Sequence, residues 1–374
     1  MIESADGVSD LFFVVGKPPQ VEVFGKLKAY PDDSPAAMLS PNKTEELSVF
    51  LMNGVERLHR DLATLGACDC SYAIPGFARF RVNIFKQNGN HAIVMRKLNS
   101  AIPTMEKLGL QPVFSEIIKE KNGIIFVTGA TGSGKTTTLA AMLNELNQTQ
   151  EFHIVTLEDP IEFMHPHAKA TFSQRELGRD FSEFAQGLRS ALRQAPKVIL
   201  VGEIRDRETM EIALTAAETG HVVYSTLHTI NAGQSINRIL GMFTKDEEQQ
   251  VRERLADTLR YIVSQRLISK VGGGRIMINE ILGSNLRTRE TLLLGESDGK
   301  TFADIIEASN PYGWQTFDQA LIDAFSKGLI TEETARIFAT SKSKVSHGLD
   351  AAKKILRPED NAIPSGFKLM SHGG

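Results

Sequence analysis

The sequence predicts an α/β protein in which a small mixed α/β domain precedes a larger domain built on a parallel sheet. Three observations support this prediction. A glycine-rich loop, GATGSGKT, lies at 129–136 between the apolar run 124–128 and a helix-like run from Thr137. After this loop, apolar runs of strand length alternate with amphipathic helices, as a parallel sheet requires. Before it, short strands surround one helix.

Composition limits the class of protein. The chain has 374 residues, of which 41% are hydrophobic and 23% charged, which is typical of a globular protein with room for two domains. A net charge of -3 provides no overall attraction for nucleic acid or an anionic membrane. No apolar run approaches the roughly 20 residues that span a bilayer, and no secretory signal is recognisable. We therefore expect a cytoplasmic protein that docks on a membrane only through another protein.

The first predicted domain covers residues 1–102, and a linker containing two prolines follows at 103–112. A helix is expected at 44–65 with Thr44 as its cap. Cys68 and Cys70 lie two residues apart and so face one side of a strand; we expect reduced cysteines, with a metal or redox role as the alternative. The expected strands are 11–15, 21–24, 68–73, 78–85 and 91–97.

The second predicted domain covers residues 113–340 and ends in helices. Helices are expected at 181–194 and 207–219, and one long helix or two at 244–268. Further helices are expected over 282–338, and residues 341–374 form a tail expected to be partly disordered. The expected strands are 153–157, 197–201, 221–225 and 275–278, and the expected core of the C-terminal helices is Leu321, Ile322, Ala324 and Phe325.

The glycine-rich loop matches the P-loop pattern G-x-x-x-x-G-K-[ST] in its strand-loop-helix context. Its glycines let successive N–H groups approach an anion closely. Lys135 would meet the β- and γ-phosphates of ATP, and the Thr136 hydroxyl would hold Mg²⁺. A glycine-rich turn that merely precedes a helix is the alternative. The predicted nucleotide-binding residues are Gly129, Ala130, Thr131, Gly132, Ser133, Gly134, Lys135, Thr136 and Thr137.

A second acidic group is expected after the apolar strand 197–201. Gly202 and Glu203 follow this strand and so lie at the carboxyl edge of the sheet, where ligands bind. Glu203 would hold the Mg²⁺ shell together with Thr136 and would prepare a water for attack on the γ-phosphate. Without the preceding P-loop, an acid after an apolar run would indicate only the ordinary end of a strand.

Two further groups of polar residues follow strands. Glu158, Asp159 and Glu162 form an acidic cluster, which predicts Mg²⁺ or a basic partner nearby because clustered carboxylates repel one another. A solvated loop is the alternative. His221 and His228 lie at opposite ends of one strand, where the second can sense a γ-phosphate or polarise the attacking water. Without the P-loop, both would be ordinary histidines.

The motifs GATGSGKT, TLEDPIEF, VILVGEIRD and ETGHVVYSTLHT occur in this order. Their order resembles the Walker A, Asp, Walker B and His boxes of the secretion ATPases, and specifically of the type IV pilus twitching (PilT-like) retraction ATPases. The segments SDLFFVVGKPP, YAIPGFARFRVNIFKQ, TMEKLGL and WQTFDQAL extend this resemblance over most of the chain. It implies an N-terminal PAS-like α/β domain, a RecA-like ATPase domain with a helical C-terminal extension, and a homohexameric ring.

The resemblance also implies roles for individual residues. Glu203 would be the catalytic base, and Arg81 and Arg96 match the arginines that this family brings to the nucleotide. Solvated strand arginines are the alternative for this pair. The implied catalytic residues are Glu203, Glu162, Glu158, His228, His221, Arg81 and Arg96.

The implied function is a motor that retracts type IV pili by Mg²⁺-dependent ATP hydrolysis. Its implied partners are an inner-membrane platform protein and a paralogous pilus ATPase, and no nucleic acid is expected. The alternatives are an auxiliary pilus ATPase, a type II or IV secretion ATPase, a nucleic-acid motor and an ATP-binding scaffold without turnover. Balanced charge and 7% aromatic residues disfavour the nucleic-acid motor. Intact Lys135 and Glu203 disfavour the scaffold.

Two segments differ from the family pattern, and two absences favour retraction over extension. Ala195-Pro196-Lys197 replaces the acids usual before the Walker B strand, and Asn285–Glu290 only loosely resembles the C-terminal motif of retraction ATPases. The sequence has no tetracysteine zinc segment and no extra N-terminal domain, both of which are usual in extension ATPases.

Overall fold

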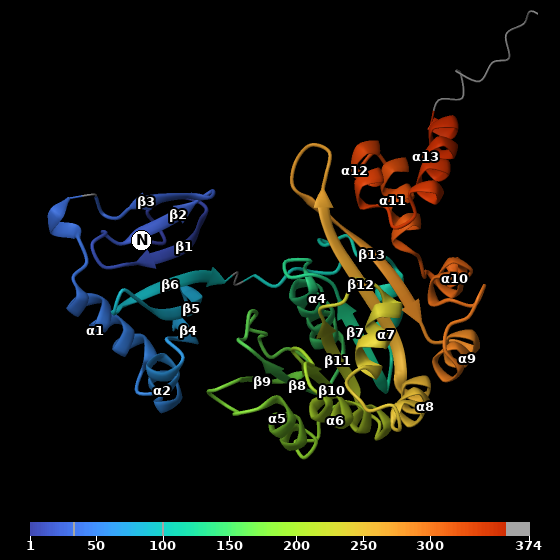
Figure 1. The fold of residues 1–374 in the computed structure, drawn as a ribbon, viewed down its shortest axis with the longest axis horizontal. Helices are drawn as coiled ribbons and strands as arrows, with labels where there is room; N and C mark the ends of the chain where they lie inside the picture. The colour runs from blue at the N-terminus through green and yellow to red at the C-terminus, as the bar shows by residue number, and fades with distance from the viewer. Residues whose placement is uncertain (33, 99–100, 357–374) are drawn as a thin grey trace, which may run out of the picture. The chain divides into compact units, whose positions relative to one another are not determined.

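The computed structural model describes residues 1–32, 34–98 and 101–356, and Figure 1 shows their elements. The chain forms two compact units. Unit 1 contains Met1–Pro103 and Asn147–Ser190, and unit 2 contains Thr104–Leu146 and the chain from Ala191 onward. The change of unit after residue 103 lies close to the predicted end of the first domain. Residues 147–190 were expected in the second domain but group with unit 1, so the predicted boundaries remain a prediction.

The N-terminal part of unit 1 is an antiparallel sheet with the strand order β3-β2-β1-β6-β5-β4. Two helices pack on β4, β5 and β6, and the core between them includes Leu51, Met52, Phe80, Val82 and Ile84. All five predicted strands are present, and β3 is an additional short strand. The elements are β1 Val8–Phe13, β2 Gln20–Val23, β3 Lys26–Ala29, η1 Pro35–Ala37, α1 Pro41–Met52, α2 Glu56–Thr64, β4 Ala67–Ile74, β5 Ala78–Gln87 and β6 Asn90–Leu98.

The prediction of one helix capped by Thr44 is wrong. Two helices occupy this segment, and they are separated at Asn53 and Gly54, whose φ angles are 47° and 71°. A residue in this left-handed conformation ends a helix. Ser40 caps α1 by accepting the Lys43 N–H at 3.4 Å. Thr44 lies inside α1, and its hydroxyl donates to the Pro41 carbonyl at 3.0 Å. The fixed φ angle of proline suits the first position of a helix. Because Pro41 occupies this position, α1 begins earlier than expected.

Unit 1 also contains a parallel pair of strands, β8 His153–Glu158 and β9 Thr171–Glu176. β9 was not predicted because its polar sequence, TFSQRE, lacks an apolar alternation. The helix α5 Phe184–Ala191 follows it and is shorter than the predicted 181–194. The hydroxyl of Ser71 on β4 donates to Glu176 at 2.6 Å, a contact within unit 1.

In unit 2 the strands lie in the order β13-β12-β7-β11-β10. β12, β7, β11 and β10 are parallel, and β13 is antiparallel to β12. Every residue of β7, β10 and β11 is buried, as expected for parallel strands covered on both faces. The elements are α3 Val113–Ile117, β7 Gly123–Thr128, α4 Lys135–Thr149, β10 Val198–Val201, α6 Arg207–Glu218, β11 Val222–Leu227, α7 Ala232–Leu240, α8 Glu248–Thr258, β12 Leu259–Ser269 and β13 Arg275–Gly283.

The prediction of helix throughout 244–268 is wrong for its second half. α8 ends at Thr258, and β12 begins at the next residue. Leu259, Ile262 and Val263 are buried apolar residues at i, i+3 and i+4, a spacing that mimics a helical face. The spacing is misleading here because β12 lies between β7 and β13 and buries residues on both of its faces.

The C-terminal part of unit 2 is helical. α13 occupies the start of the segment predicted as a tail, because Val345, Leu349 and Ala352 recur at helical spacing and are buried. Of the predicted core, Leu321 and Ala324 are buried, whereas Ile322 and Phe325 are half-buried. The last dozen residues, expected to be disordered, lie outside the described residues. The elements are α9 Leu286–Leu294, α10 Phe302–Glu307, η2 Asn310–Tyr312, α11 Phe317–Ser326, α12 Glu332–Phe338 and α13 Lys342–Leu356.

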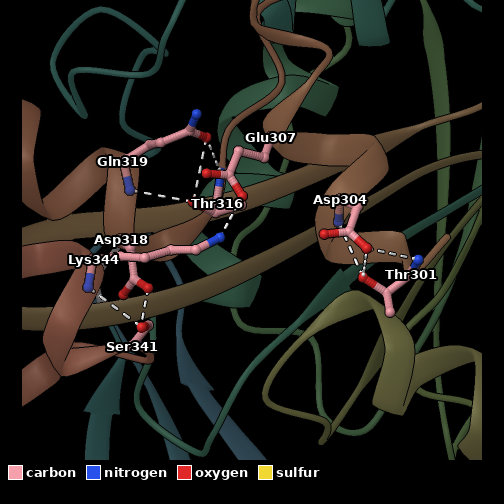
Figure 2. Close-up of polar contacts among 8 residues, drawn as sticks. All are labelled: Thr301, Asp304, Glu307, Thr316, Asp318, Gln319, Ser341 and Lys344. Carbon is pink, nitrogen blue, oxygen red and sulfur yellow. Dashed lines mark hydrogen bonds and ion pairs between the residues drawn. The ribbon is translucent and has the colours of Figure 1, made fainter. Parts of the chain in front are cut away.

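Polar contacts join α10, α11 and α13, as Figure 2 shows. Asp318 on α11 is buried, and its carboxylate accepts the main-chain N–H groups of Thr340 at 2.7 Å and Ser341 at 2.9 Å. Lys344 on α13 donates to Glu307 on α10 at 2.6 Å. A carboxylate at a helix N-terminus satisfies amide donors that have no partner within the helix. Asp318 therefore fixes the start of α13.

Candidate nucleotide-binding site

Parallel strands bring three of the predicted motifs to one edge of the sheet in unit 2. Thr128, the last residue of β7, pairs with Leu227 of β11, and Val201 of β10 pairs with Ser225 of β11. The P-loop, Glu203 and His228 follow these strand ends, so all three lie at the carboxyl edge. Ligands of α/β sheets bind at this edge.

The P-loop needs glycine at its first position. Gly129 has a φ of 144°, and a Cβ there would lie 2.5 Å from the Gln265 carbonyl oxygen and 2.5 Å from Ser133 Oγ. No other residue fits this space without moving the backbone of β12. α4 begins at Lys135, two residues earlier than predicted. The N-terminus of α4 therefore directly follows the loop, which is the arrangement that binds phosphate.

Side chains of the loop also fit an anion. Lys135 is only 9% exposed, and its Nζ donates to the carbonyl oxygens of Gly129 at 2.8 Å and Ala130 at 3.1 Å. Ser133 Oγ is buried and has no hydrogen-bond partner among the residues that the structure describes. A buried hydroxyl normally has a partner, and a phosphate oxygen would supply one. Thr136 is exposed on the first turn of α4.

The two carboxylate oxygens of Glu203 have different surroundings. Its Oε1 pairs with Arg205. Its Oε2 is buried, makes no hydrogen bond within the described part of the chain, and lies 3.6 Å from Nε2 of His228. The Thr226 hydroxyl holds the preceding Gly202 carbonyl at 2.7 Å, which fixes the loop. The free Oε2 can accept a proton or a hydrogen bond from a water.

The residues present also fit Mg²⁺. A hard cation prefers oxygen ligands, which the Thr136 hydroxyl and the Glu203 carboxylate offer. Mg²⁺, when bound, would neutralise charge that develops on the β- and γ-phosphates. Residues 1–32, 34–98 and 101–356 contain no group of three or more His, Cys, Asp or Glu side chains that could hold a metal. Phosphate and water oxygens would therefore complete the shell.

A cavity of about 740 Å³ adjoins the P-loop. Small-molecule sites usually have volumes of about 300–1,000 Å³. Ser133, Gly134 and Thr138 line this cavity on the loop side, and Asn279 of β13 and Gln315 line another side. Gln315 Nε2 donates to Asn279 Oδ1 at 2.6 Å. The sequence did not reveal these last two residues, because they follow the P-loop by well over a hundred residues and belong to none of its motifs.

The acidic cluster lies in unit 1. Glu158, at the end of β8, is buried, and its Oε1 accepts from Thr156 Oγ1 at 2.6 Å and Gln174 Nε2 at 3.2 Å. Burial raises the pKa of Glu158 to about 7, the nearby Glu162 adds to this rise, and Arg79 opposes it. Arg79 is thus the basic neighbour that the cluster predicts. The catalytic roles of Glu158 and Glu162 stay a prediction.

The two histidines differ in position. His228 lies beside Glu203, but His221 precedes β11 at the opposite edge of the sheet. Its Nδ1 lies 3.0 Å from the Ala216 carbonyl at the end of α6. A strand of this length separates the two edges by roughly 20 Å. The structure therefore does not bring His221 to the P-loop of its own chain, and its catalytic role stays a prediction.

The predicted arginines lie on the N-terminal sheet of unit 1. Arg81 on β5 and Arg96 on β6 are directly opposite each other in the antiparallel pairing, and both are exposed. Arg79, two residues before Arg81 on β5, shares their face, but its guanidinium lies 3.9 Å from Glu176. Contact of Arg81 or Arg96 with a nucleotide stays a prediction.

The two cysteines are strand residues of β4 and are both free. Burial is the main cause that raises the pKa of Cys68 to about 11 and that of Cys70 to about 12. Both thiols therefore stay protonated at neutral pH, which makes them poor nucleophiles. The prediction that they have no metal or redox role stays a prediction.

None of the helices in the described part of the chain is both long and apolar enough to cross a bilayer.

Comparisons with known proteins agree with this site. Residues 72–285 match the family model described as type II/IV secretion system protein. The chain is 43% identical over 330 residues to the type IV pilus retraction ATPase PilT of Pseudomonas aeruginosa, covering 88% of this chain and 94% of that protein. It is 38% identical over 336 residues to the type IV pilus ATPase PilU of the same species, covering 90% and 86%.

A solved structure is similar as well. The crystal structure of the pilus retraction motor PilT with bound ADP matches with a TM-score of 0.82 and 40% identity, over 91% of this chain and 96% of that one. The prediction of an α/β secretion ATPase with an N-terminal sheet domain is thereby confirmed. The chain is a P-loop ATPase that belongs to the type II/IV secretion system protein family, among the relatives of the pilus retraction ATPases.

Proposed function

We propose that this chain is the motor that retracts type IV pili, driven by Mg²⁺-dependent ATP hydrolysis. The observation that carries the proposal is the similarity to PilT, which continues through both units instead of ending with the nucleotide motifs. In the same proposal the motor is a homohexamer on the cytoplasmic side of the inner membrane. It acts on a platform protein of the pilus and works beside a paralogous ATPase.

The site supports a hydrolytic mechanism. Lys135 and the N–H groups of residues 129–137 bind the phosphates of ATP. The free Oε2 of Glu203 takes a proton from a water, whose oxygen attacks the γ-phosphorus while the bond to the bridging oxygen breaks. ADP and inorganic phosphate are the products. Nε2 of His228 lies 3.6 Å from Oε2 of Glu203 and orients this carboxylate and the water.

Arginines are proposed to complete the site. Arg81 and Arg96 would meet the charge that spreads over the transferring phosphoryl group, an interaction worth about 10³–10⁵ in turnover in related chemistry. Glu158 and Glu162 would support the same site from the acidic cluster, and His221 would act at the opposite edge of the sheet. For these five residues the support is the match to family motifs.

Two related functions compete with this proposal. An auxiliary pilus ATPase has the same chemistry, and the chain is 38% identical to PilU against 43% to PilT. A secretion ATPase is favoured less, since the similarity to the type II secretion system protein E of Xanthomonas campestris, at 40% identity, covers only 51% of this chain. The two values for the pilus proteins are close, so an experiment in cells must separate retraction from an auxiliary role.

The test is to image pili in cells that lack this protein. A retraction motor gives surplus pili that do not retract, and a plasmid copy of the parent protein restores retraction. A copy with Lys135→Ala does not, because it loses nucleotide binding. Cells without any pili would overturn the proposal in favour of an extension ATPase, and normal retraction would favour an auxiliary role. Native mass spectrometry with an ATP analogue checks the hexamer; monomers at all concentrations would contradict it.

A further inference from the structure

Charged residues form a row across the N-terminal sheet. Asp10 of β1 pairs with Arg96 of β6, and Arg96 pairs with Arg81 of β5. Residues that pair directly lie on the same face of a sheet. This face is opposite to the one that packs on α1 and α2, because the alternate residues Phe80 and Val82 belong to that core. The row therefore places Asp10 beside Arg96, and Arg96 beside Arg81.

A β-bulge puts the acid into this row. Val8 pairs with Val23, but Asp10 pairs with Glu22, so Ser9 is an extra residue in β1. Without the extra residue, Asp10 would pair with Val21 and would point toward the core. Bulges of this kind redirect side chains and often lie beside active sites. The bulge therefore places the side chain of Asp10 on the same face of the sheet as Arg81 and Arg96.

Asp10 and Arg96 differ greatly in exposure. Asp10 is 6% exposed and its Oδ1 accepts from Arg96 Nε at 2.8 Å, whereas the Arg96 side chain is 69% exposed. A guanidinium has five N–H donors, and this bond uses only the one at Nε. The terminal nitrogens of Arg96 make no ion pair with any other described residue. They form the planar fork that binds phosphate in bidentate fashion.

We infer that Asp10 is a positioning residue, which holds Arg96 by Nε so that its fork engages the γ-phosphate of ATP. This inference rests on the proposed role of Arg96. Two arginines directly opposite each other repel. Asp10 offsets the charge of Arg96 and so reduces this repulsion. Asp10 touches neither nucleotide nor water in this proposal and acts only through Arg96.

A double-mutant cycle tests the inference. Turnover, KM for ATP, ADP affinity and melting temperature are measured for Asp10→Ala, Arg96→Ala and the double variant in assembled protein. We expect Arg96→Ala to lower kcat at least about 100-fold and Asp10→Ala to lower it roughly 10-fold, with ADP affinity within about threefold. The double variant should match Arg96→Ala, because Asp10 has nothing left to position.

The outcomes separate the inference from the proposed function. Parent turnover in Arg96→Ala would remove the proposed role of Arg96. If Arg96→Ala lowered kcat strongly but Asp10→Ala lowered it less than threefold, the inference about Asp10 would be overturned, and the proposed role of Arg96 would stand. A loss from Asp10→Ala that is equally large in the Arg96→Ala background would also overturn it, since Asp10 would then act by another route.

Two further variants control for folding and for charge. Asp10→Asn keeps the shape and an acceptor oxygen for Arg96 Nε, so we expect it to regain most of the turnover lost in Asp10→Ala; it replaces Asp10→Ala in the cycle if that variant does not assemble. If Asp10→Asn lost as much turnover as Asp10→Ala while its melting temperature equalled that of the parent protein, positioning by this hydrogen bond would be contradicted. Glu22 pairs with Asp10 in the sheet and makes no ion pair with any residue that the structure describes. Glu22→Ala should therefore leave turnover unchanged.

Discussion

Two acids of unit 2, Glu203 and Asp318, have opposite surroundings. Glu203 has one oxygen in an ion pair with Arg205 and one buried oxygen that no described residue contacts by a hydrogen bond. Asp318 is also buried, but both of its oxygens accept main-chain N–H groups at the start of α13 (Figure 2). Burying a carboxylate oxygen without a partner costs free energy, so such an oxygen needs a reason that lies outside the fold.

The comparison separates function from stability. The free oxygen of Glu203 is available to a water or a cation, so its removal should change the chemistry and leave the fold intact. The oxygens of Asp318 are fully used inside the protein, so its removal should loosen the C-terminal helices and leave the chemistry intact. Substitution of one acid, or of its neighbour, should therefore change either ATP turnover or the free energy of unfolding.

Glu203→Gln carries the largest expected effect. The amide cannot accept a proton, so we expect ATP turnover to fall about 10²–10⁴-fold. Phosphate release measures turnover, and binding of a fluorescent ATP analogue should stay within about threefold. The melting temperature should not fall, because one oxygen of the lost carboxylate was buried and accepted no hydrogen bond from a described residue. Turnover at the parent rate would remove Glu203 as the base.

Asp318→Ala should act on stability. It leaves two main-chain N–H groups at the start of α13 without their charged acceptor, a loss of about 3 kcal/mol in the free energy of unfolding. Urea unfolding at a fixed protein concentration measures it. Asp318→Asn retains one acceptor oxygen and should lose about half as much. Reduced kcat in Asp318→Ala at unchanged stability would break the distinction drawn from the two acids.

The sequence predicted the positions of the P-loop and Glu203 better than the residues that line the cavity beside them. The P-loop and Glu203 were predicted correctly in place, because a phosphate loop and the strand end beside it are defined by residues adjacent in the chain. Asn279 and Gln315 were not predicted, because only the packing of β13, and the pairing of Gln315 with Ile281 of this strand, bring them there. Likewise, the apolar spacing of β12 is the same in a buried strand and a helix, and only its neighbours decide between them.

The hydrogen-bond partners of the buried acids also could not be predicted from the sequence. Nothing near Asp318 in the chain indicates that its partners are Thr340 and Ser341, since α11 and the start of α13 meet only in the folded protein. The bulge at Ser9 is similar: alternation alone would assign Asp10 to the core face, and the pairing of β1 with β2 reverses this assignment. Motifs therefore indicate which acids are present, and tertiary contacts determine which of them are free.

Glu158 is an intermediate case, buried but held by neutral side chains. Burial raises its pKa from 4.5 to about 7. Between these pH values the folded protein binds more protons than the unfolded chain, so this contribution to stability is complete below pH 4.5 and is lost as pH rises through 7. The loss between pH 5 and 8 is roughly 2–3 kcal/mol.

Glu158→Gln tests this pH dependence. The amide does not titrate, so the variant should lack the part of the stability loss that the parent shows between pH 5 and 8. Urea midpoints of both proteins at four pH values, without nucleotide, give the difference. Parallel curves for parent and variant would show that Glu158 is ionised in the folded protein at pH 5, as a satisfied acid would be.

Lys344→Ala should have the smallest effect, although Lys344 lies beside Asp318 in Figure 2. Its Nζ is 2.6 Å from Glu307 Oε2, but the two side chains are 59% and 43% exposed. Water and salt screen such a pair, and its ordering costs side-chain entropy, so we expect a loss of about 0.5 kcal/mol or less. Glu307→Gln is the matched control and should lose a similar amount. If Lys344→Ala cost as much as Asp318→Ala, the start of α13 would depend on the ion pair instead of the buried carboxylate, and burial would not be what distinguishes these acids.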